Sequence, residues 1–146
     1  MISEALLNPK SIVVVGGSND ITKPGGKVIY NLQLHKFQGS LFAINPKEKE
    51  IRGIPCFSSC HELPSVDLAI IAIAAKFVEE TVKILATEKG CKGFILFSAG
   101  FGETDEAGKA LEKRIVKIVE ENGGTIIGPN CIGIITEKYK GVFAGP

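Results

Sequence analysis

Short apolar runs and helical patterns alternate along this chain from residue 11 onward. The apolar runs predict five strands, and a further short apolar segment follows them at residues 133–135. The run at residues 67–73 is apolar enough to predict a strand covered on both faces. The predicted strands span residues 11–16, 40–45, 67–73, 93–97 and 125–127.

Three segments between these strands show the 3.6-residue spacing of amphipathic helices. We expect a helix over residues 26–37, a second over 76–89, and a third that ends near Gly123-Gly124. The apolar residues expected to face the sheet are Val28, Ile29 and Leu32, then Val78, Val82 and Leu85, then Ala107, Leu111, Ile115 and Ile118.

This alternation predicts an α/β protein of the Rossmann-like, doubly wound type, with a mainly parallel sheet of five to six strands and helices on both faces. Its 146 residues fit a single domain spanning 1–146. Right-handed crossovers bring all strand-to-helix loops to one edge, where ligands of open α/β sheets bind. These loops are 16–19, 45–47, 74–76, 98–102 and 128–131.

Composition removes several classes of partner. The net charge is +1, aromatic residues are few and Trp is absent, so we expect no nucleic-acid partner. No apolar run approaches the roughly 20 residues of a membrane span, and the N-terminus lacks a signal-peptide core, which favours a cytoplasmic protein without membrane contact. Four scattered cysteines in a chain with an ample core favour reduced thiols.

The segment 11–27 carries the clearest chemical signal. A buried strand runs into Gly16-Gly17-Ser18-Asn19, and a second glycine pair, Gly25-Gly26, opens a helix. Backbone N–H groups converge at such a turn, and the helix dipole adds about half a positive charge. The segment therefore predicts a phosphate site.

The loop after the second predicted strand bears on which nucleotide binds. A dinucleotide such as NAD calls for G-x-G-x-x-G and an acid about 20 residues further on, at the end of the second strand. This chain has Asn45-Pro46-Lys47 there. A lysine favours a phosphorylated ribose, as in NADP or in coenzyme A with its 3′-phosphate. The alternative is that Lys47 is a solvated charge beside Glu48, Lys49 and Glu50.

Six short motifs occur in order and at fitting intervals on these loops. Together they resemble the CoA-binding domain of the NDP-forming acyl-CoA synthetases, relatives of the succinyl-CoA synthetase α subunit, over essentially the whole chain. The motifs are Gly16-Gly17-Ser18-Asn19, Lys23-Pro24-Gly25-Gly26-Lys27, Asn45-Pro46-Lys47, Ala75-Lys76-Phe77-Val78, Ser98-Ala99-Gly100-Phe101 and Gly128-Pro129-Asn130-Cys131.

The resemblance implies a set of cofactor-binding residues. Gly17, Ser18, Asn19 and Lys47 would contact phosphate and ribose, the loop after the third strand would flank the cofactor, and the last two loops would line the thioester end. A proline common in the third-strand loop is replaced by Ala74. The full set expected is Gly16, Gly17, Ser18, Asn19, Gly25, Lys27, Asn45, Lys47, Ile73, Ala74, Ala75, Lys76, Ser98, Gly100, Asn130 and Cys131.

The resemblance also implies the larger reaction. The complete enzyme would convert acyl-CoA, NDP and phosphate to the carboxylic acid, CoA and NTP through a phosphohistidine on a following domain, which this chain lacks. We therefore expect the N-terminal fragment of a longer synthetase, inactive alone, with ATP/ADP or GTP/GDP bound only elsewhere. Its expected partners are coenzyme A and further synthetase domains or a β-type ATP-grasp subunit; a homo-oligomer stays open. A stand-alone CoA-binding or regulatory protein and an NAD(P)-binding protein are the alternatives.

No residue is expected to be catalytic or to hold a metal. His35 is expected to be solvated. Cys56, Cys60 and His61 could offer three metal ligands, but a structural zinc site needs four, so this segment is expected to be an ordinary loop. Cys131 has no obvious neighbouring base and is expected to pack or to contact the ligand.

Overall fold

The computed structural model describes residues 4–97, 106–128, 133–135 and 140–142. Its centre is a sheet in the order β3-β4-β2-β1-β5-β6-β7, parallel except for the β3–β4 pair. The described strands of this sheet are β1 (Ser11–Val15), β2 (Ser40–Ile44), β3 (Glu50–Ile51), β4 (Ile54–Phe57), β5 (Leu68–Ile71), β6 (Gly93–Leu96) and β7 (Thr125–Ile127).

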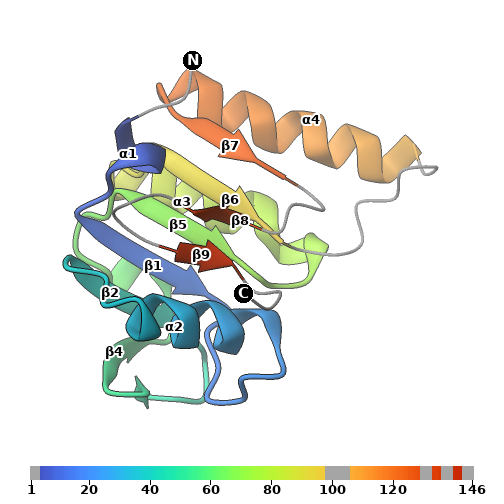
Figure 1. The fold of residues 1–146 in the computed structure, drawn as a ribbon. Helices are drawn as coiled ribbons and strands as arrows, with labels where there is room; N and C mark the ends of the chain where they lie inside the picture. Colours follow the sequence, from blue (N-terminus) through green and yellow to red (C-terminus); the bar gives the residue numbers. More distant parts are fainter. Residues whose placement is uncertain (1–3, 98–105, 129–132, 136–139, 143–146) are drawn as a thin grey trace.

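Helices cover both faces of the sheet (Figure 1). Helices α3 (Val78–Glu88) and α4 (Glu106–Glu121) lie on one face, with the 3-10 turn η1 (Cys60–Glu62), and the turn η2 (Ala75–Phe77) leads into α3. On the other face lie α1 (Glu4–Leu7), α2 (Pro24–Leu34) and the hairpin of β8 (Gly133–Ile135) and β9 (Lys140–Val142).

Successive side chains of β1 point to opposite faces of the sheet, and the core is divided accordingly. Ile12 and Val14 pack with α2, whereas Val13 and Val15 pack with α3 and α4. All four side chains are buried, so the run of β-branched residues is apolar on both sides of the sheet.

The predicted architecture is confirmed, with two additions to the sheet. All five predicted strands form, but β3 and β4 join the sheet beyond β2, so it has seven strands rather than five to six. The apolar segment 133–135 pairs with β9 in a separate two-stranded sheet. Short, partly polar strands such as these carry too few residues for an alternation signal.

The helices form where predicted, with shifted ends. Helix α2 begins at Pro24, which suits the first helical position because its missing N–H needs no partner there. It ends at Leu34, shortly before Lys36 turns to a φ of +54°. The placement of Ala107 on the buried stripe of α4 is wrong: Ala107 is exposed, and Val119 is buried instead.

Candidate functional site

Three of the five predicted loops lie in the described part of the carboxyl edge. Residues 16–19 follow β1, residues 45–47 follow β2 and residues 74–76 follow β5. Because β2, β1 and β5 are adjacent and parallel, these loops are neighbours, at the end toward which the arrows of Figure 1 point. Ser98, Gly100, Asn130 and Cys131 lie outside the described residues.

The glycine loop packs directly on the first turn of α2. A Cβ added to Gly25 would lie 2.0 Å from the carbonyl oxygen of Gly16, and one added to Gly26 would lie 2.0 Å from that of Asp20. Gly16 has a φ of +88°, and a Cβ there would lie 2.2 Å from the carbonyl oxygen of Ala72. Side chains are therefore excluded where the loop, the helix and the β5 end meet.

Backbone donors are left open along this loop. The N–H of Gly16 donates to Ile44 O at 3.0 Å, but no hydrogen bond within the described part of the chain occupies the N–H groups of Gly17, Ser18 and Asn19. Lys23, the N-cap residue of α2, makes no side-chain cap bond. Open N–H groups beside a helix N-terminus favour an anion such as a phosphate.

Asp20 closes the loop without occupying these donors. Its Oδ1 accepts from both the N–H and the hydroxyl of Thr22, at 2.9 and 2.6 Å. These bonds, aided by the charge of Lys23, lower the pKa of the Asp20 carboxyl, which is ionised at neutral pH. The Asp20 carboxylate thus bonds to Thr22 and not to the N–H groups of the glycine loop.

Asn45 holds the glycine loop to the end of β2. Its Nδ2 donates to Gly17 O at 2.9 Å, and its Oδ1 accepts from the N–H of Lys47 at 2.8 Å. The sequence predicts Asn45 as a cofactor contact; in the structure both ends of its amide group bond to backbone. The side chain therefore supports two adjacent loops.

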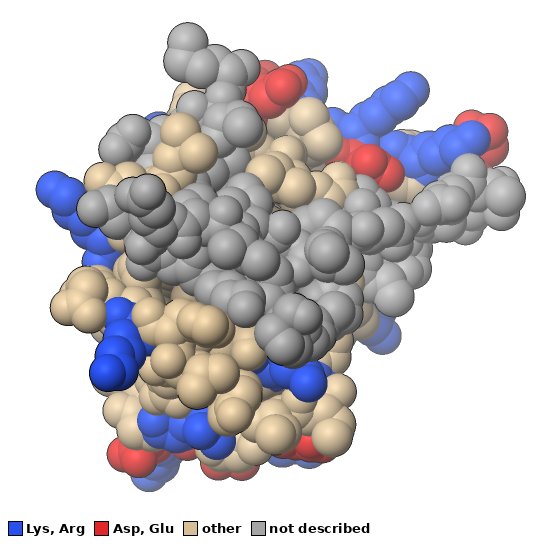
Figure 2. Space-filling view, in the orientation of Figure 1, with Lys and Arg blue, Asp and Glu red and all other residues tan. Residues whose placement is uncertain are grey.

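Lysine and arginine side chains are scattered over the face that Figure 2 shows, and the predicted cations differ in their exposure. Lys47 and Lys76 are exposed, and Lys27 is half-buried in the first turn of α2. The Lys76 Nζ lies 5.1 Å from the centre of the Phe77 ring. Ala74 is exposed and Ala75 half-buried, so the loop after β5 presents small side chains near the edge.

A cavity of about 460 Å³ opens beside these loops. Gly16, Asn45 and Ile73, all in the predicted set of cofactor-binding residues, line it together with residues outside that set. These further residues come from the segment after β4, from the end of η2 and from the first turn of α3: Ser58, Ser59, Cys60, His61, Phe77 and Thr81.

One sequence signal could have located part of this wall. Ser59 and Glu62 form a capping box: the Ser59 hydroxyl accepts from His61 N–H, and the Glu62 carboxylate accepts from Ser59 N–H at 3.1 Å. Ser-x-x-Glu is a recognisable helix-start pattern. The expectation of an ordinary loop from Cys56 to His61 is wrong, since Cys56 belongs to β4 and His61 to η1.

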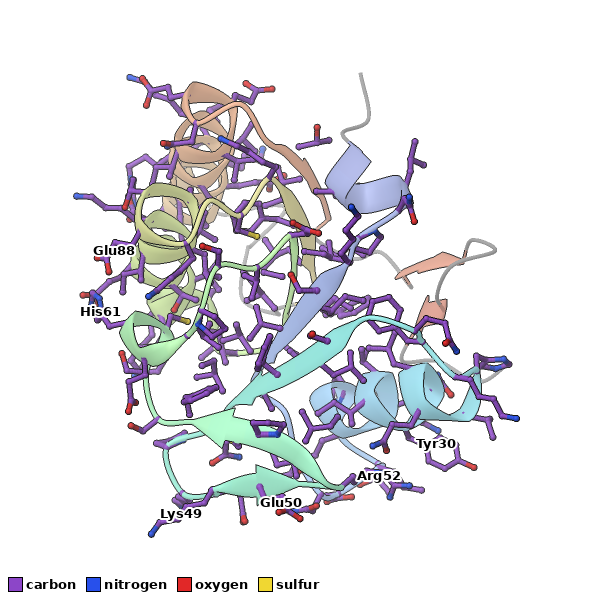
Figure 3. The ribbon with its side chains drawn as sticks, turned by 90° about the vertical axis from the view of Figure 1, so that its left-hand side faces the viewer. Tyr30, Lys49, Glu50, Arg52, His61 and Glu88 are labelled. Carbon is purple, nitrogen blue, oxygen red and sulfur yellow. The ribbon has the colours of Figure 1, made fainter. Side chains whose placement is uncertain are left out.

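The described cysteines lie at different depths: Cys60 and Cys91 are buried, and Cys56 is half-buried. Cys56, Cys60 and Cys91 are free thiols. Burial raises the pKa of the Cys60 thiol to about 11, so it is protonated at neutral pH. His61 instead approaches Glu88, with 2.8 Å between Nδ1 and Oε1 (Figure 3). No cluster of three metal-ligating side chains occurs among the described residues.

Residues 10–137 match the model of a family described as a CoA binding domain. The chain belongs to the CoA-binding domain family. The described loops at the carboxyl edge of its sheet, residues 16–19, 45–47 and 74–76, fall within the matched range, and so do the sequence positions 98–102 and 128–131.

Relatives of this CoA-binding domain are found among archaeal ligases. It is 46% identical over 129 residues to the acetate–CoA ligase [ADP-forming] II subunit alpha of Pyrococcus furiosus, and the alignment covers 88% of this chain and 28% of that protein. It is 38% identical over 134 residues to the acetate–CoA ligase [ADP-forming] II of Archaeoglobus fulgidus, covering 91% and 20%. The chain thus spans less than a third of either relative.

Solved structures agree with this fold. A protein of Pyrococcus horikoshii OT3 has a TM-score of 0.88 at 41% identity, and the match covers 97% of this chain and 33% of the chain of that protein. The dinucleotide forming acetyl-coenzyme A synthetase 1 of Ca. Korarchaeum cryptofilum has a TM-score of 0.87 at 29% identity, with coverages of 97% and 31%. In the part of the CoA-binding domain that the structure describes, no helix has the length and apolar character to cross a membrane.

Proposed function

We propose that this domain binds coenzyme A at the carboxyl edge of its sheet, as one part of an ADP-forming acyl-CoA synthetase. The observation that carries the proposal is the set of open N–H groups on Gly17, Ser18 and Asn19 beside the N-terminus of α2. The family match and the ADP-forming ligases among its relatives support coenzyme A as the phosphate-bearing ligand and ATP/ADP as the nucleotide of the whole enzyme.

The residues present fit such a ligand. The glycine contacts let backbone approach the pyrophosphate, as no Cβ fits at Gly16 or Gly25. The exposed Lys47 is proposed to hold the 3′-phosphate of the ribose, and the small residues Ala74 and Ala75 to flank the cofactor. When bound, coenzyme A supplies the thiol that accepts the acyl group.

The remaining predicted contacts complete the proposal. Gly25 and Lys27, in the first turn of α2, would contact the phosphate end of the cofactor. Lys76 would flank the cofactor from the loop after β5. Ser98, Gly100, Asn130 and Cys131 would line the thioester end. The reaction of the whole enzyme would need further synthetase domains or a β-type subunit, since this chain spans 28% of the Pyrococcus furiosus subunit alpha.

Calorimetric titration tests both the ligand and the role of Lys47. We expect coenzyme A to bind, NAD and NADP to bind at least tenfold more weakly, and dephospho-CoA to bind about tenfold more weakly, because one charge-assisted phosphate contact is lost. Lys47→Ala should weaken coenzyme A binding by a similar factor and leave dephospho-CoA binding unchanged. Lys49→Ala, the loss of an exposed lysine two residues away, is the matched control and should bind as the parent does.

Two results would contradict this proposal. Tight binding of a nicotinamide dinucleotide without binding of coenzyme A would remove the function. Equal affinity for coenzyme A and dephospho-CoA would keep the function and exclude Lys47 from the site, leaving it as a solvated charge.

A further inference from the structure

The turn that joins β3 to β4 has an unusual residue at its first position. Arg52 and Gly53 have φ values of +50° and +82°. Two successive positive φ values define a type I′ hairpin turn, which favours Asn-Gly, Asp-Gly or Gly-Gly. Arginine is unfavourable there, and such local strain persists only where surrounding contacts offset it.

The Arg52 side chain supplies contacts of this kind to α2. Its guanidinium carbon lies 5.2 Å from the centre of the Tyr30 ring, and its Nε donates to Gln33 Oε1 at 3.0 Å. Gln33 Nε2 donates back to Arg52 O at 2.8 Å. In Figure 3 Arg52 lies beside Tyr30 where the hairpin meets α2, whereas Lys49 lies at the opposite end of the hairpin.

The backbone of the same residue contacts the glycine loop. The N–H of Arg52 donates to Asn19 Oδ1 at 3.2 Å, a bond between residues 33 positions apart. Asn19 is the last of the three loop residues whose own N–H groups are open. Arg52 thus contacts α2 with its side chain and the glycine loop, residues 16–19 (called the phosphate loop below), with its backbone N–H.

We propose that Arg52 is a positioning residue for the phosphate loop, acting through Asn19. The side chain sets the turn against α2, the turn N–H then fixes the Asn19 side chain, and the loop N–H groups are held in the geometry that a phosphate needs. This inference rests on the proposed binding of coenzyme A. It extends the site to the β3–β4 hairpin, which none of the predicted contacts includes.

Substitution at the turn separates positioning from stability. Asn suits the first position of a type I′ turn, so R52N loses the contacts to α2 while it relieves the backbone strain. We expect its thermal midpoint to stay within about 3 °C of the parent, because the two effects oppose each other. Its affinity for coenzyme A should nevertheless fall about fivefold. R52K keeps a cation near Tyr30 and should recover about half of that loss.

Two further variants test the route through Asn19. K49N removes a positive charge from the same hairpin and should bind coenzyme A as the parent does. In an N19A background, R52N should cause no additional loss of affinity, because its effect passes through the missing side chain.

The inference would be overturned by parent-like affinity in R52N, by an equal loss in K49N, or by a full fivefold loss of R52N in the N19A background. A fall in the thermal midpoint large enough to account for the lost affinity would also overturn it. Failure of the parent chain to bind coenzyme A would instead overturn the proposed function, so the two failures are distinguishable.

Discussion

Gly25 shows how a single residue type shapes the candidate site. It lies in the first turn of α2, within the predicted motif Lys23–Lys27, and the carbonyl of Gly16 occupies the space that a side chain would need. Only glycine fits at position 25, because any side chain would clash with the backbone of Gly16. The same close contact brings the open N–H groups of the loop beside the helix N-terminus, where an anion is favoured.

Gly25→Ala is expected to disturb both stability and binding. A Cβ 2.0 Å from Gly16 O would force the loop away from α2. We expect a loss of about 2–4 kcal/mol in the free energy of unfolding, measured by urea denaturation, and loss of coenzyme A binding.

Gly90→Ala is the matched control for this prediction. Gly90 has a φ of +65° with open space where a Cβ would stand, so only the backbone conformation is penalised, by about 1–2 kcal/mol. Coenzyme A should still bind to this variant. Equal losses of stability and binding in the two variants would contradict the steric explanation.

Helix α3 illustrates two kinds of contact at the scale of an element. Its inner face contributes the buried side chains Val78, Val82 and Leu85, which pack on the sheet. Its outer face carries Glu88, which approaches His61 of η1, and Glu79, which accepts from Arg114 Nε of α4 at 3.1 Å. Both of these pairs are largely exposed, so the apolar face should hold the helix.

Leu85→Ala and Glu88→Gln should therefore differ strongly. Leu85 is fully buried, and its truncation should lower the free energy of unfolding by about 2–5 kcal/mol. Glu88→Gln removes an exposed charge from the pair with His61 and should change it by less than about 0.5 kcal/mol. Equilibrium denaturation at pH 7 measures both; comparable losses would show that the surface contact with His61 stabilises α3 as much as burial of Leu85 does.

At the scale of the whole molecule, a buried thiol makes the free energy of unfolding depend on pH. Cys91 precedes β6 and is fully buried, and its Sγ donates to Gly93 O at 3.2 Å. Burial raises the pKa of this thiol from its ordinary value of 9.0 to about 12. Above pH 9 the unfolded chain releases this proton while the folded chain retains it, so folding becomes less favourable as the pH rises.

Alkaline unfolding is therefore expected to depend on Cys91. The free energy of unfolding should fall from about pH 9 and continue to fall toward about pH 12, and Cys91→Ala should reduce this slope. Denaturation series between pH 8 and 11 measure the slope. Cys56→Ala, which removes a half-buried thiol, is the control and should change it less. An unchanged slope in Cys91→Ala would assign the alkaline loss to other groups.

The sequence by itself determined the parts of this protein that depend on local pattern. The run Ile12–Val15 predicted a buried strand, and Val28, Ile29 and Leu32 predicted the inner face of α2; all are buried as expected. The glycine turn after β1 predicted a phosphate site, which stays a prediction. Apolar periodicity and backbone sterics are set within a few residues, so these features can be recognised without a fold.

Only the tertiary structure decided which distant residues meet. The bond from Arg52 to Asn19, the support of Gly17 by Asn45, and the cavity wall formed by Ser58, Ser59 and His61 join segments that are far apart in the chain. The strands β3 and β4 are short: β4 gains its place through pairing with β2, and β3 through pairing with β4. Such contacts have no periodic signature, because each one depends on the crossovers and packing that bring its two segments together.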